Sequence, residues 1–119
     1  PNEQRAKFYN LCDLYIMPTR EILEKGDVEG FGITYLEANA CEKPVIGSKA
    51  GGCPEAIIDG ETGFLVNPID SNEIAKTCVM LLHNKELSKK IGENGRMRII
   101  REFNWDNVCR QIEKYISSI

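Results

Sequence analysis

A glycine-rich turn at the predicted start of a helix is the part of this sequence best suited to bind a ligand. Gly30 and Gly32 flank Phe31 there, and a glycine lets the backbone approach a ligand closely. The amides of Gly32, Ile33 and Thr34 belong to the first turn, where backbone donors lack intrahelical partners. Because these amides and the helix dipole favour an anion, we expect a phosphate group at this turn.

Two glutamates frame the same turn at a spacing that suits a ligand with both phosphates and hydroxyls. Glu37 lies ~7 Å beyond the turn along the helix axis, so its carboxylate can hydrogen-bond to a ribose diol while the helix start binds a diphosphate. Glu29 precedes the turn and can reach hydroxyls beyond the phosphates. The alternative is a chance pairing, since glutamate near a helix start is favourable without any ligand.

Three further candidates have simple structural explanations. Gly51 and Gly52 follow a predicted strand, where they either line the same cleft or form a plain tight turn. His83 closes a predicted helix, and a cation there suits the helix dipole without a catalytic role. Trp105 is predicted to anchor the core rather than to stack on a sugar.

The cysteines do not form a recognisable metal site. There are five, widely spaced and without a C-x-x-C pair: Cys12, Cys41, Cys53, Cys78 and Cys109. With only one histidine beside them, we expect neither a metal ion nor another cofactor. The cysteines are predicted to be reduced and mostly buried.

Short apolar strands alternate with helices along the chain. Strands are predicted at residues 12–18, 44–48 and 63–67. Helices are predicted at 3–11, 32–42 and 55–58, after a cap at Asp70 or Ser71, at 87–103 with a break near 92–95, and after a cap at Asn104. This alternation indicates an α/β fold: a Rossmann-like three-layer unit with about three parallel strands flanked by helices. We expect one domain over residues 1–119, the second half of a larger sheet whose first strands are absent.

Composition narrows the class of protein. The chain has 119 residues, 42% of them hydrophobic and 28% charged, as in a soluble globular domain. Its net charge of −3 argues against nucleic-acid binding.

Residues 85–101 interleave basic and acidic side chains, which is typical of a solvated helix face; attraction to a membrane surface is a minor alternative. Without a signal peptide or a long apolar run, the protein is predicted to be cytoplasmic, with contact at the membrane surface as the alternative.

Several stretches together resemble one enzyme family. They are Leu14-Tyr15-Ile16-Met17-Pro18-Thr19, Glu29-Gly30-Phe31-Gly32 with Leu36-Glu37-Ala38, Cys41-Glu42-Lys43-Pro44-Val45-Ile46, Gly51-Gly52-Cys53-Pro54-Glu55, and Asp59-Gly60-Glu61-Thr62-Gly63-Phe64-Leu65-Val66. In this order they resemble the family 4 retaining glycosyltransferases of the GT-B fold, from about residue 8 to residue 105. Glu29 and Glu37 match that family's E-x7-E motif, which lies in its C-terminal, donor-binding domain.

The resemblance implies a role for each residue of the turn. It makes Glu29 the catalytic residue and assigns the donor to Gly30, Phe31, Gly32, Ile33, Thr34 and Glu37. Glu29 would face the transferred sugar, the amides of residues 31–32 its hydroxyls, those of 33–34 the diphosphate, and Glu37 the ribose. The implied activity is hexosyl transfer from a nucleotide diphosphate sugar to a glycan, lipid or small-molecule acceptor in glycan biosynthesis, with no metal.

Two departures from the family pattern qualify this expectation. Glu42 stands where the family usually has glycine. Glu42 must therefore adopt a less favourable backbone conformation, or the end of the helix must shift. The family's basic residues for the diphosphate, its upstream strands and its N-terminal acceptor domain lie outside this sequence. We therefore expect the chain alone to be inactive and to self-associate through an exposed strand edge.

Two other functions stay open. The alternative within the same fold is a non-catalytic nucleotide-sugar binding or regulatory module, because a fold alone does not fix function. Half of a dinucleotide oxidoreductase is disfavoured, since the sequence lacks G-x-G-x-x-G.

Overall fold

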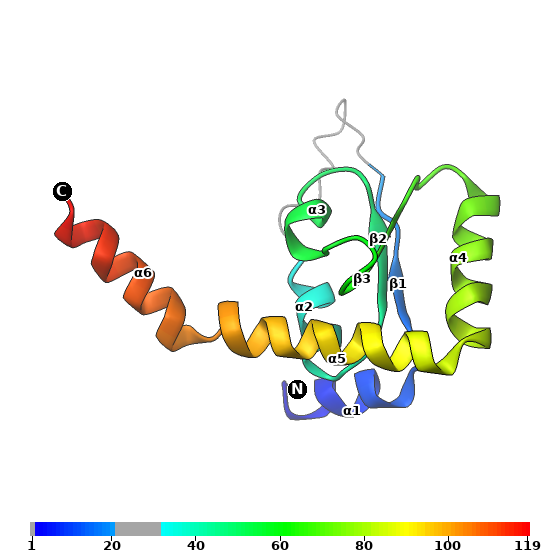
Figure 1. Cartoon of the computed structure of the whole chain (residues 1–119), viewed down its shortest axis with the longest axis horizontal. Coiled ribbons are helices and arrows are strands. Elements are labelled where there is room, and N and C mark those ends of the chain that lie inside the picture. The colour runs from blue at the N-terminus through cyan, green and yellow to red at the C-terminus, as the bar shows by residue number, and fades with distance from the viewer. Residues whose placement is uncertain (1, 21–31) are drawn as a thin grey trace.

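Three short parallel strands lie at the centre of the fold in the computed structural model, which describes residues 2–20 and 32–119 (Figure 1). The elements in chain order are α1 (Asn2–Leu11), β1 (Tyr15–Met17), α2 (Ile33–Ala40), β2 (Val45–Ser48), α3 (Cys53–Ala56), β3 (Gly63–Val66), α4 (Ser71–His83), α5 (Lys85–Glu102) and α6 (Trp105–Ser117). Within these residues the sheet order is β1-β2-β3, and both pairings are parallel. The predicted α/β class is confirmed, with strands somewhat shorter than expected.

The central strand β2 separates two cores, one on each face of the sheet. Val45 points into the core formed with α2 and α3, around the fully buried ring of Tyr35. Its neighbour Ile46 points to the opposite face, against Leu81 of α4. Successive strand residues face opposite ways, so a strand covered on both sides is apolar throughout. The helices therefore cover both faces, as the predicted three-layer unit requires.

Helix α5 is continuous, so the predicted break near residues 92–95 is wrong. Both glycines in this stretch are buried against the segment that includes the end of α2. A Cβ on Gly92 would lie 2.0 Å from the carbonyl oxygen of Glu42, and one on Gly95 would lie 2.6 Å from the Asn39 side chain. The glycines allow close packing of α5 rather than ending it.

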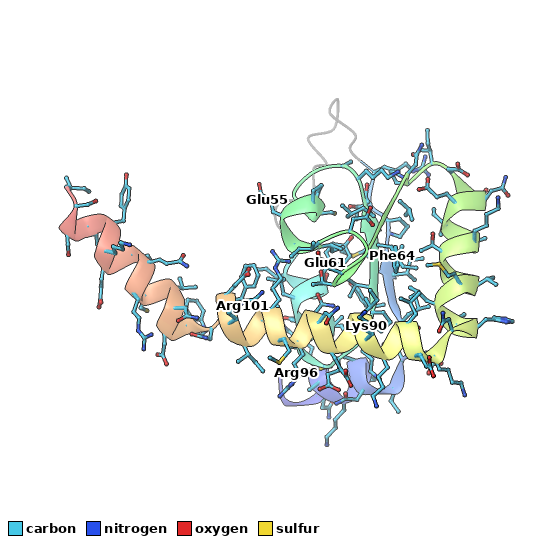
Figure 2. The ribbon with its side chains drawn as sticks, viewed as in Figure 1. Glu55, Glu61, Phe64, Lys90, Arg96 and Arg101 are labelled. Carbon is cyan, nitrogen blue, oxygen red and sulfur yellow. The ribbon has the colours of Figure 1, made fainter. Side chains whose placement is uncertain are left out.

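One basic residue of α5 departs from the predicted solvated face. Lys90, Arg96 and Arg101 are exposed along the helix (Figure 2), but Arg98 is only 9% exposed. Its guanidinium donates to the carbonyl oxygens of Ala56 at 2.7 Å and of Glu55 at 2.9 Å. Arg98 thereby ties α5 to the end of α3.

The last helix, α6, extends away from the sheet (Figure 1). Trp105, at its start, is 82% exposed, so the prediction of a core anchor is wrong. Ile112 and Ile116, on its apolar stripe, are also exposed. In the described part of the chain, no helix combines the length and apolar character needed to cross a membrane.

The end of α2 confirms the expectation for Glu42. Its φ is 59°, in the left-handed region that glycine prefers. The amide of Glu42 donates to Asn39 O, and that of Lys43 donates to Ala38 O. These two bonds define the helix-ending turn in which a left-handed residue is required.

Candidate functional site

The start of α2 is held against the carboxyl end of β1 by one buried tyrosine. Tyr35 is fully buried, and its hydroxyl donates to the carbonyl oxygen of Met17, the last residue of β1. The thiol of Cys53, at the start of α3, donates to the same hydroxyl at 3.5 Å. The tyrosine thus joins the start of α2 to the ends of two other elements at this edge of the sheet.

Gly32 sets the backbone conformation at the start of α2. It caps α2 with φ 76° and ψ 55°, in the left-handed region. A Cβ there would lie 2.5 Å from the ring of Tyr35, so both the backbone and the packing require glycine. The sequence predicts this residue at the helix start, and the structure confirms that position.

The first turn of α2 has the features of an anion site. In an α-helix each amide donates to the carbonyl four residues earlier. The amides of Ile33 and Thr34 belong to the first turn, so no carbonyl of α2 itself is placed to accept from them. The Ile33 side chain is 66% exposed, whereas Gly32 and Tyr35 on either side of the turn are buried. The Thr34 hydroxyl is buried and has no hydrogen-bond partner among the described residues. Such a turn can bind a phosphate through its amides.

Glu37 lies just over one turn further along α2, where α1 packs against it. Its carboxylate accepts from Arg5 Nη1 through Oε1 at 2.8 Å and from the Tyr9 hydroxyl through Oε2 at 2.8 Å. Burial, and next the hydrogen bond to Glu37, raise the pKa of the Tyr9 hydroxyl well above its usual value. The Glu37 side chain is 27% exposed. It therefore remains reachable by a ligand while its two oxygens are held.

An open pocket adjoins this carboxylate. It has a volume of about 290 Å³ and is lined by Arg5, Ala6, Tyr9, Glu37, Ala40 and Cys41. The sequence motifs do not include Arg5 or Tyr9. Their spacing of four residues, which puts both on one face of the predicted helix 3–11, was the only available signal.

The remaining predicted site residues fall into two groups. Glu29, Gly30 and Phe31 lie outside the described residues. Gly51 and Gly52 follow β2 and form a turn, with φ 63° at Gly51. This turn leads into α3, whose first residue, Cys53, has its sulfur 3.8 Å from Thr19 Oγ1 beyond β1. The glycines thus lie near the carboxyl edge at which α2 starts.

The cysteines are free and differ in burial. Cys53 is buried, Cys109 is exposed and the other three are half-buried, so the prediction that most are buried is wrong. Across residues 2–20 and 32–119, no three His, Cys, Asp or Glu side chains are grouped so that they could hold a metal ion.

This arrangement defines a class of protein: an open parallel α/β unit with a helix start at the carboxyl edge of its sheet, the place where ligands bind in such folds. The sequence profile of the glycosyl transferases group 1 family matches residues 1–98, and the chain belongs to that family. The structure has the fold of GT-B glycosyltransferase C-terminal domains, which confirms the family resemblance.

Three similar proteins illustrate the relationship. A GDP-mannose-dependent phosphatidylinositol monomannoside mannosyltransferase of Mycolicibacterium smegmatis is 35% identical over 88% of this chain and 28% of its own length. The C-terminal domain of a group 1 glycosyl transferase from Francisella tularensis matches with TM-score 0.70 and 35% identity over 82% of this chain and 47% of that domain. The Anabaena protein HepE, solved with UDP-glucose, matches with TM-score 0.80 and 28% identity over 95% of this chain and 29% of its own. The chain thus spans under a third of the length of its curated relatives.

Proposed function

We propose that this chain is the distal part of the donor-binding domain of a retaining glycosyltransferase. The observation that carries the proposal is the position of Glu37, a half-buried carboxylate, just over one turn beyond the Gly32-capped start of α2. Family membership supports a glycosyl donor, and the complex of HepE with UDP-glucose supports a nucleotide sugar. The acceptor and the nucleotide base would be selected by parts of the protein beyond this chain.

The proposed roles follow from charge and position. The amides of Ile33 and Thr34 hold the diphosphate, and Glu37 accepts hydrogen bonds from the ribose hydroxyls. In the reaction the bond between the anomeric carbon and a diphosphate oxygen breaks, the carbon bonds to an acceptor hydroxyl oxygen, and the hydroxyl proton passes to the departing diphosphate. Negative charge grows on the leaving diphosphate, so amides already aimed at it stabilise the transition state. Glu29, outside the described residues, is proposed to face the transferred sugar, and Gly51 and Gly52 to line the cleft.

The test of the ribose contact is calorimetric titration of the full-length protein that contains this chain. The probes are UDP and GDP, followed by the 2′,3′-dideoxy analogue of the tighter binder. Glu37→Ala should weaken binding of the ribonucleotide by roughly 1.5–3 kcal/mol, the range for a charge-assisted hydrogen bond. It should leave affinity for the dideoxy analogue nearly unchanged, because that analogue lacks the hydroxyls.

Glu61→Ala is the matched control, since Glu61 is exposed near the start of β3 (Figure 2) and should not alter either affinity. Equal affinity of parent and Glu37→Ala for the ribonucleotide would exclude the ribose contact. Nucleotide binding without sugar transfer to any acceptor would instead favour the non-catalytic module. Product analysis by NMR separates retention of the anomeric configuration from inversion.

A further inference from the structure

The Glu37 carboxylate is gripped from the side of α1 by two donors that approach different oxygens. Arg5 donates to Oε1 and Tyr9 to Oε2, each at 2.8 Å. Rotation of the carboxylate about its terminal bond would disrupt both hydrogen bonds, so the pair fixes the plane of the group. A carboxylate offers about four acceptor positions, so two remain for a ligand.

Tyr9 is itself held in place by aromatic packing. Its ring packs edge-on against Tyr15 of β1, with centroids 5.6 Å apart, and Tyr15 packs in the same way against Tyr35 at 5.9 Å. Tyr35 in turn packs against Gly32 at the helix start. Three aromatic rings therefore join the hydroxyl that holds Glu37 to the residue that caps α2.

Arg5 and Tyr9 differ in how firmly they are placed. The Arg5 side chain is 57% exposed, so solvent weakens its ion pair with Glu37. Tyr9 is half-buried, so its hydrogen bond to Glu37 is better shielded from solvent. The tyrosine is thus the more effective of the two constraints.

We propose that Tyr9, assisted by Arg5, is a positioning residue that orients the Glu37 carboxylate toward the ribose hydroxyls of the donor nucleotide. This inference rests on the proposed function, because it requires Glu37 to contact ribose. A pocket lined in part by Arg5, Tyr9 and Glu37 adjoins the carboxylate, so a ligand has access to this group. Neither Tyr9 nor Arg5 need touch the reacting atoms.

The experiment measures discrimination between a ribonucleotide and its 2′,3′-dideoxy analogue in the full-length protein. Using UDP, or GDP if it binds more tightly, Tyr9→Phe should weaken ribonucleotide affinity about fivefold, the effect of one net hydrogen bond. Affinity for the dideoxy analogue should stay unchanged. Tyr115→Phe, at an exposed tyrosine of α6, is the matched control and should change neither affinity.

A second pair of variants keeps the test valid if Tyr9→Phe fails to fold. Arg5→Gln should reduce discrimination by about twofold, while Arg101→Gln, at an exposed arginine of α5, should not. Combining Tyr9→Phe with Glu37→Gln should add little to Glu37→Gln alone, because both act on one contact.

The outcomes separate this inference from the proposed function. If Glu37→Gln abolishes discrimination but Tyr9→Phe and Arg5→Gln leave it intact, the positioning role is wrong and the ribose contact stands. An equal loss of affinity for both nucleotides in Tyr9→Phe would show a structural role only and would also overturn the inference. If Glu37→Gln itself leaves discrimination unchanged, the ribose contact fails, and the positioning role fails with it.

Discussion

Replacing Gly92 by alanine tests the contact between α5 and the end of α2. A Cβ at this position would lie 2.0 Å from the carbonyl oxygen of Glu42 and 2.7 Å from its carbonyl carbon. Ordinary Cβ contacts begin near 3.4 Å, so the two segments must separate by about 1.4 Å. Both partners are backbone, and neither can rotate away as a flexible side chain would.

Two effects of opposite sign determine how much Gly92→Ala changes the free energy of unfolding. Overpacking of a filled interior costs about 1–3 kcal/mol, and a backbone clash belongs at the upper end. Alanine is favoured over glycine within a helix by about 1 kcal/mol. Gly92→Ala should therefore lower the free energy of unfolding by about 2 kcal/mol, which corresponds to about 8 °C in Tm for a chain of this length.

Urea denaturation followed by circular dichroism measures this change. Lys90→Ala is the control, because Lys90 is exposed on the same helix (Figure 2) and should shift stability by less than about 0.5 kcal/mol. If Gly92→Ala is as stable as the parent, or more stable, helix propensity dominates and the close approach of α5 to Glu42 is wrong.

Three further changes test other features of the fold. Glu42→Gly should raise the free energy of unfolding by about 1 kcal/mol in the same assay, because φ at this position is 59°, in the left-handed region that glycine adopts without strain. The exposed ion pair between Glu42 and Arg96, which this change removes, contributes little. A loss of stability would contradict this reasoning. Alkylation by iodoacetamide at pH 8, followed by mass spectrometry, should be slower at Cys41 than at exposed Cys109, since burial raises the pKa of the Cys41 thiol and lowers its thiolate fraction; equal rates would refute that cause. In sedimentation velocity Ile16→Lys should reduce self-association of the chain, because β1 is an edge strand of the described sheet; a parent chain that is monomeric at all concentrations would show that the edge does not associate.

The alternation of strands and helices was readable because its signals are local. Continuous apolar runs predicted β2 and β3, and the caps at Asp70 and Asn104 start α4 and α6 as expected. The burial of Arg98 and Trp105 could not be predicted from local sequence patterns, because it depends on which distant segments of the chain lie beside them. Arg98 is buried by carbonyls of Glu55 and Ala56 in α3, whereas Trp105 has no such cover among the described residues.

Gly92 and Gly95 show the same limit in a different form. In an isolated helix a glycine is a weak point, so sequence alone favours a break at this place. In the structure the missing side chains allow α5 to approach Glu42 and Asn39, and this contact outweighs the poor helix propensity.

The sequence by itself determined the class of fold, the turn at Gly32 and the position of Glu37 on the helix that follows. These depend on glycine's backbone freedom and on helical spacing, which are properties of neighbouring residues. Only the tertiary structure decided what surrounds the Glu37 carboxylate. Tyr9 and Arg5 come from another helix, 28 and 32 residues earlier, and meet Glu37 because the packing of α1 on β1 and α2 brings them there. Contacts between such distant residues follow from how the elements pack, which local sequence patterns do not specify.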